Sequence, residues 1–117
     1  MRCLIALGMS AWLLATPALA HHGWGGYDAS QPETLKGTIE QVQPSGPHAM
    51  IWLKADTKTW EIVLAPPSRM ANRGLPATDL KIGEAVEVYG YLHRSRSEEM
   101  RAEWIRTAAS PTPIQLR

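Results

Sequence analysis

Helix-forming signals after residue 33 are confined to one short segment, Pro66 to Asn72, and this limits the chain to folds built almost entirely from strands. Proline is tolerated in the first turn of a helix, and Gly74 follows at a position that suits a helix end. On both sides of this segment, apolar and polar residues alternate with the period of two that is typical of β-strands. The sequence therefore predicts an all-β domain with a single short helix.

The strand-like segments lie at 34–43, 48–54, 59–65, 84–93 and 99–107, with a last extended piece near 114–116. Three strands, a helix and two further strands is the order of the oligonucleotide/oligosaccharide-binding (OB) fold, a five-stranded Greek-key barrel. We therefore expect an OB-like β-barrel of five to six strands over residues 34–117. Another small antiparallel barrel or a sandwich is the alternative.

Alternation also predicts which side chains of the last long strand share a face. Met100, Ala102 and Trp104 fall on one face, and Arg101 and Glu103 fall on the other. The two charged residues are then placed to make cross-strand ion pairs, a structural role.

The short helix carries two arginines, Arg69 and Arg73, four residues apart and so on one face. They can grip an anion or pair with carboxylates of the strands, such as Glu61. We favour the second role, in which Met70 and Leu75 plug the open end of the barrel and the arginines are ion-paired.

The first twenty residues have the three regions of a cleavable secretory signal peptide. Arg2 gives a positive start, residues 4–15 form an apolar run, and Ala18-Leu19-Ala20 supplies the small-x-small pattern before cleavage. The apolar run is shorter than the roughly 20 residues needed to span a bilayer. We expect a periplasmic or secreted protein without a membrane span after cleavage, beginning with an extended arm over residues 21–33.

Cleavage changes the composition, because the only cysteine, Cys3, leaves together with Arg2. No disulfide or thiolate ligand is then expected. The 12 Lys and Arg of the full chain fall to eleven, which balance the 11 Asp and Glu. A domain without net positive charge is a poor candidate for nucleic acid binding. With no nucleophile motif, phosphate loop or HExxH motif, an enzyme is not favoured either.

Cleavage after Ala20 makes His21 the first residue of the processed chain. Its α-amine and imidazole can chelate one metal ion together, and nitrogen ligands in near-square geometry suit Cu(II). OB topology places the start of the second strand and the end of the fourth strand near one rim of the barrel. The other candidate ligands are the imidazoles of His22, His48 and His93 and the thioethers of Met50 and Met100. Our leading hypothesis is an exported copper-binding protein.

Two other hypotheses stay open. His21 and His22 are equally compatible with a solvated arm, and each methionine with packing. A non-catalytic barrel can instead bind a ligand or an envelope protein through an exposed aromatic face, with the candidates Trp52, Tyr89, Tyr91, Arg69 and Arg73. An enzyme that uses the N-terminal copper for oxidation has the least support, because no substrate platform is evident beyond these aromatic residues.

Several short motifs, spread over nearly the whole processed chain, resemble those of a family of short exported bacterial proteins, domain of unknown function 6152. They are His21-His22-Gly23-Trp24, Pro47-His48-Ala49, Pro66-Pro67-Ser68-Arg69-Met70, Arg73-Gly74-Leu75 and Met100-Arg101-Ala102-Glu103. The resemblance implies export and a compact β-domain. It assigns no activity, so the copper hypothesis depends on the residues themselves.

Overall fold

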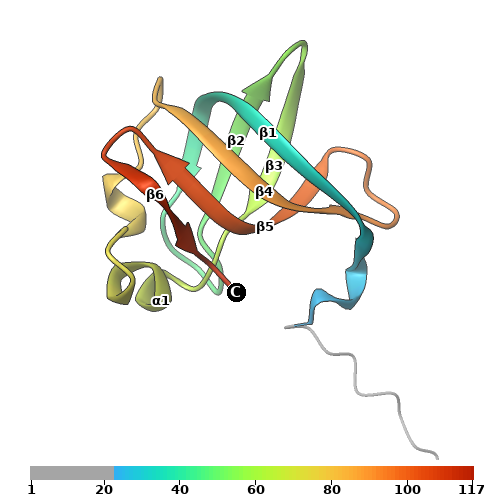
Figure 1. Cartoon of the computed structure of the whole chain (residues 1–117), viewed down its shortest axis with the longest axis horizontal. Coiled ribbons are helices and arrows are strands. Elements are labelled where there is room, and N and C mark those ends of the chain that lie inside the picture. Colours follow the sequence, from blue (N-terminus) through green and yellow to red (C-terminus); the bar gives the residue numbers. More distant parts are fainter. Residues whose placement is uncertain (1–22) are drawn as a thin grey trace, which may run out of the picture.

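The computed structural model of the protein describes residues 23–117, and in it six strands form one sheet that closes on itself (Figure 1). The strands are β1 (Tyr27–Gln43), β2 (Met50–Ala55), β3 (Lys58–Val63), β4 (Ala85–His93), β5 (Glu99–Thr107) and β6 (Ser110–Gln115). The helix α1 (Pro67–Asn72) lies between β3 and β4, and two 3-10 turns, η1 (Trp24–Gly26) and η2 (Ala77–Asp79), precede β1 and β4. The predicted all-β class and the order of strands around one short helix are confirmed.

β1 joins the two halves of the sheet. Residues 27–38 pair antiparallel with β4, and residues 38–43 pair antiparallel with β2. Gly37 lies where the strand changes partner, and a Cβ atom there would approach the Lys54 carbonyl oxygen to 2.1 Å. Only glycine permits this close crossing, which gives the sheet its order β3-β2-β1-β4-β5-β6.

β1 begins at Tyr27, earlier than the predicted start at Thr34. Most side chains between these two residues are exposed, so this part of the strand has no buried face and no alternation in the sequence. Most of the described part of the predicted arm is therefore strand. The predicted signal peptide, His21 and His22 lie outside the described residues.

β5 closes the barrel. It pairs antiparallel with β4 along its length and parallel with β3 over three residue pairs, which are Glu61 with Glu99, Ile62 with Met100, and Val63 with Arg101. The barrel is filled by apolar side chains from all of its long strands, including Ile39, Ile51, Leu53, Ile62, Val88, Met100 and Ile105. Met70 of α1 and Leu75 are also buried, as expected for a plug at one end.

One predicted face of β5 is wrong. Ala102 is buried in the core, but Trp104 lies outside and stacks on Tyr89, with ring centroids 5.6 Å and planes 11° apart. Trp104 is opposite Tyr89 in β4, whereas Ala102 is opposite the next residue, Gly90. Glu103 is therefore an extra residue, and such a β-bulge reverses the alternation that follows it.

No helix within residues 23–117 is long and apolar enough to cross a membrane.

The change Gly37→Ala should lower the free energy of unfolding by at least about 2 kcal/mol, because the new Cβ collides with backbone and the crossing of β1 must open. Gly25→Ala is the matched control, since a Cβ there has no atom within 4 Å. Urea denaturation followed by circular dichroism measures both. Equal midpoints for the two variants would contradict the close crossing at Gly37.

Candidate functional site

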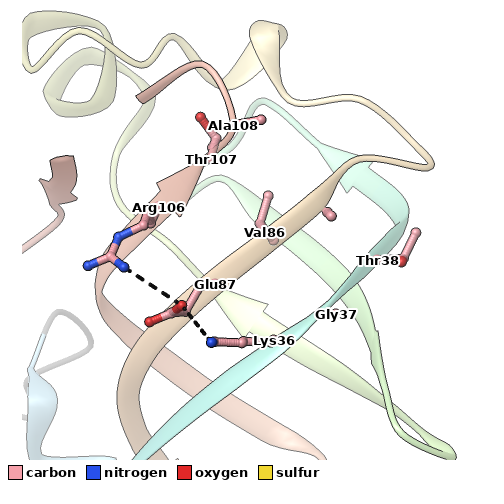
Figure 2. Close-up of a pocket in the computed structure, with 9 residues that line it drawn as sticks. Lys36, Gly37, Thr38, Val86, Glu87, Arg106, Thr107 and Ala108 are labelled. Atoms are coloured by element: carbon pink, nitrogen blue, oxygen red, sulfur yellow. Dashed lines mark ion pairs between the residues drawn. The ribbon is translucent and has the colours of Figure 1, made fainter. Parts of the chain in front are cut away.

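Figure 2 shows a pocket between β1, the start of β4 and the end of β5. Its volume is about 520 Å³. Its charges are already paired: an oxygen of Glu87 lies 3.6 Å from Lys36 Nζ and 3.9 Å from Arg106 Nη1. None of the residues predicted to bind a metal or ligand lines it. This pocket is therefore not the candidate site.

A different pocket, of about 640 Å³, lies where the start of the described chain meets the barrel. We call it the arginine pocket, and it is lined by Trp24, Pro47, His48, Pro66, Arg69, Arg101 and Arg117. Beside it is a smaller hollow of about 290 Å³, the His48 hollow, lined by Gly23, Tyr27, Gln43, Pro47, His48, Met50, Val63 and Arg101. Pro47, His48 and Arg101 line both spaces, and the two polar side chains among them, His48 and Arg101, are the centre of the candidate site.

Arg101 contacts both Gly23 and His48. Its Nη1 donates to the Gly23 carbonyl oxygen at 3.2 Å, and its Nη2 lies 3.2 Å from His48 Nε2. A guanidinium can only donate hydrogen bonds, so His48 Nε2 accepts this one and the proton of a neutral His48 is on Nδ1. The contact between residues 23 and 101 thus brings the N-terminal segment to the rim that carries His48.

The Arg101 guanidinium is buried, with 6% of the residue exposed. The Trp24 ring covers it at 4.3 Å from the ring centroid, and the guanidinium of Arg117 lies 4.8 Å from the same centroid. Burial lowers the pKa of Arg101, and the nearby charges of Arg69 and Arg117 lower it further. Within residues 23–117 no ion pair joins these three arginines to a carboxylate. The site therefore has a concentrated positive charge.

The other predicted metal ligands are dispersed. Met50 lines the His48 hollow, but Met100 is fully buried in the core and lines neither space. His93 Nδ1 lies 3.1 Å from two backbone nitrogens, those of Ser95 and Arg96, which donate to it. No group of three or more His, Cys, Asp or Glu able to hold a metal ion occurs among the residues that the structure describes.

Tyr27 lies between His93 and the His48 hollow. Its ring meets the His93 ring edge-on at 5.1 Å, and it also lines the hollow. The Tyr27 hydroxyl donates to Glu99 at 2.6 Å, and burial together with this hydrogen bond raises the pKa of Tyr27. The structure therefore brings His48 and Met50 to one hollow and holds His93 on the far side of a tyrosine.

The predicted aromatic face is only partly assembled. Tyr89 and Tyr91 lie 6.0 Å apart, and Trp24 continues the row at 5.9 Å from Tyr91. Trp52 is opposite Gln41 of β1, while Tyr89 is opposite Thr34 on the other flank of that strand. No ring contact joins Trp52 to the tyrosines in the described part of the chain. We call Trp104, Tyr89, Tyr91 and Trp24 the aromatic row.

The expected pairing of the α1 arginines with Glu61 is wrong. Arg69 Nη1 donates to the Leu116 carbonyl oxygen at 3.1 Å, and Arg73 Nη1 donates to the carbonyl oxygens of Gln115 and Arg117 at 2.7 and 2.9 Å. Glu61 instead accepts a hydrogen bond from Arg96. The helix thus fastens the end of the chain to the barrel, and this places Arg69 and Arg117 in the arginine pocket.

The expected ion pairs of Arg101 and Glu103 are also wrong. Glu103 accepts a hydrogen bond from the Tyr91 hydroxyl, and Arg101 contacts Gly23 and His48. Sequence reasoning missed Arg101 as a site residue. An arginine between two core residues of a strand was the available signal, but its contacts come from segments far away in the chain.

The change Tyr91→Phe should remove one group from the alkaline titration of the folded protein. The hydrogen bond to Glu103 is the main cause, and burial a smaller one, of a pKa of Tyr91 that is raised from 10.0 to about 12. The folded protein then holds this proton more tightly than the unfolded chain, so the stabilisation is complete below pH 10.0 and is lost as the pH rises through about 12. Absorbance at the tyrosinate band measures the titration. A lost titration step near pH 10.0 instead of about 12 would contradict the Tyr91–Glu103 contact.

Several solved structures share this architecture. The S. pombe Stn1-Ten1 complex matches with a TM-score of 0.55 and 17% identity over 68% of this chain and 60% of that chain. TiaS, a tRNAIle2 agmatidine synthetase, matches in a ZRD-deleted mutant with agmatine at a TM-score of 0.52 and 18% identity, over 66% of this chain and 21% of that chain. At such identities the likeness shows an OB-like fold alone, and this chain spans only part of each of these proteins.

The sequence profile of a family of unknown function, DUF6152, matches residues 11–102. No curated protein sequence matches the chain.

Proposed function

This chain belongs to DUF6152, a family of unknown function, and from its own residues we propose that it is an exported copper-binding protein. The proposed metal site consists of the α-amine and imidazole of His21 with the imidazoles of His22 and His48. The periplasm or cell exterior follows from the signal peptide predicted over residues 1–20. Binding without catalysis is proposed because the sequence has no recognisable catalytic motif.

One observation carries the proposal: Gly23, two residues after His21, lines the same hollow as His48. Gly23 is held by Arg101, and the same guanidinium contacts His48 Nε2. Two residues span at most about 7 Å, so a chain that begins at His21 has its α-amine within a short reach of the His48 hollow.

The residues at this rim suit copper in two ways. An amine and imidazoles are nitrogen donors, which Cu(II) prefers in near-square geometry. Met50 lines the same hollow and offers a thioether, a soft donor that favours Cu(I). His48 can use Nε2 only if Arg101 moves away, because Arg101 donates a hydrogen bond to that atom.

The arginines oppose a bound cation, because like charges close together raise each other's free energy. The affinity must therefore come from the nitrogen ligands and their chelate with the N-terminus. We accordingly expect binding to depend strongly on the free α-amine.

A second candidate function is binding of a ligand or an envelope protein at the aromatic row. Ring contacts of 5.6 to 6.0 Å join its four members, and each is only half-buried. Partly exposed Trp and Tyr side chains are common at binding surfaces because they combine apolar area with a polar group. Trp52, which lies apart from this row, has no part in this candidate.

Exported protein should begin at His21, because Ala18-Leu19-Ala20 provides the cleavage pattern. Intact-mass measurement of protein recovered from the periplasm or medium checks this. A start several residues away would remove the chelate of amine and imidazole and contradict the proposed site.

Addition of one residue before His21 should weaken Cu(II) binding more than His22→Ala does. The extra residue converts the α-amine into an amide, whereas His22→Ala removes at most one further donor. His48→Ala should have an intermediate effect, with a loss of at least about tenfold in Kd for one well-placed ligand. Calorimetric titration of Cu(II) into each processed protein measures the series.

His93→Ala is the matched control, because Tyr27 separates His93 from the hollow. Its affinity should stay within about twofold of the unmodified protein. Equal affinities across all the variants would contradict the copper proposal and favour the aromatic row as the functional surface.

A further inference from the structure

Within residues 23–117, the arginine pocket gathers three arginine side chains that form no ion pair with Asp or Glu. Arg69 comes from α1, Arg101 from β5 and Arg117 from the end of the chain. Two other arginines of this domain are paired: Arg96 lies 3.0 Å from Glu61 and 2.8 Å from Glu99, and Arg106 lies 3.9 Å from Glu87. The unpaired cluster is therefore a local feature and not a consequence of a basic composition.

Arg101 is the most costly member of the cluster, because it is a buried cation. It is 6% exposed, and its Nε atom has no hydrogen-bond partner among the described residues. A buried charge is unfavourable unless a counter-charge and hydrogen bonds compensate it. The Trp24 ring gives partial compensation through a cation–π contact at 4.3 Å. A negative group in the pocket would supply the missing counter-charge.

The guanidinium groups still have donors for such a group. Each has five N–H bonds, and among residues 23–117 the Nη atoms of Arg101 make one hydrogen bond each, with Gly23 and His48. Arg69 is held in place by one bond from Nη1 to the Leu116 carbonyl oxygen. Planar guanidinium groups bind carboxylates and phosphates through paired, charge-assisted hydrogen bonds.

Apart from the arginines and His48, the lining of the pocket is apolar, and the pocket is larger than a simple ion. Its volume is about 640 Å³, and Trp24, Pro47 and Pro66 form walls without charge. Pockets of this size generally hold small organic ligands, which they orient with a few polar groups on a mostly apolar surface. An aromatic or aliphatic part of a ligand could lie against these walls while its anionic end meets the arginines.

We infer that the arginine pocket is a binding site for a small organic oxyanion, a carboxylate or a phosphate ester. Arg101 and Arg69 bind the anionic group, Arg117 closes the site from the end of the chain, and Trp24 contacts the organic part. This inference is independent of the proposed copper site, because it needs neither a metal nor the free α-amine.

The test uses three probes on the processed, metal-free protein at low salt: phenyl phosphate, benzoate and inorganic phosphate. Phenyl phosphate and benzoate share an apolar ring and differ in the anionic group, so they distinguish the two ligand chemistries. At least one of the two should bind, and should bind more tightly than inorganic phosphate. Calorimetric titration measures the affinities. Failure of both aromatic probes to bind at millimolar concentration, or equal affinity for inorganic phosphate, would overturn the inference.

Variants locate the binding. Arg101→Gln and Arg69→Gln should each weaken the tighter probe at least about tenfold, because each removes a charged hydrogen-bond donor. Arg106→Gln is the matched control: it removes an equal charge from the same strand as Arg101, at the unrelated pocket of Figure 2, and should change the affinity less than about twofold.

Two further measurements distinguish a loss of anion binding from a loss of folding or of copper binding. If Arg101→Gln does not fold by circular dichroism, Arg69→Gln and Arg117→Gln decide the matter, because both side chains are on the surface. The protein with one residue added before His21 should keep full affinity for the probe. An equal loss of probe affinity in Arg106→Gln and in the pocket variants would show only general charge attraction and would overturn the inference.

Discussion

The parallel pairing of β5 with β3 over three residues is the contact on which this molecule depends. It closes the sheet into a barrel, and it places Arg101 opposite Val63 of β3 while Tyr91 of β4 lies on its other side. The neighbours of Arg101 along the strand, Met100 and Ala102, are in the core. Closure of the barrel thus forces the arginine between them outward, to the rim that carries His48.

The N-terminal segment then completes the site by covering this arginine. Gly23 accepts its hydrogen bond and Trp24 packs on its guanidinium, although Gly23 and Arg101 are 78 residues apart in the sequence. Arg101 therefore belongs to both sites: it contacts the proposed copper ligand His48, and it lines the inferred anion pocket. A bound anion would reduce the local positive charge and favour a nearby cation, and linkage requires that the metal favour the anion by the same factor.

Much of the fold could be predicted because buried strands reveal themselves by alternation. β4 and β5 have nearly the expected bounds, and the plug formed by Met70 follows from the position of α1. Alternation failed where its physical cause is absent: along the exposed first part of β1, and after the bulge at Glu103, which turned Trp104 outward. Partners were harder to predict, since Arg69 and Arg73 bind backbone carbonyls that only the folded chain brings near.

In the proposed site, the N-terminus and His48 meet beside Arg101 and bind one metal ion together. A crystal structure of the protein beginning at His21, with one equivalent of Cu(II), tests it most directly. We expect copper bonded to the amine and imidazole of His21 and to His48, with Arg101 turned away from His48 Nε2. Copper held without His48, while Arg101 still donates to that ring, would contradict it.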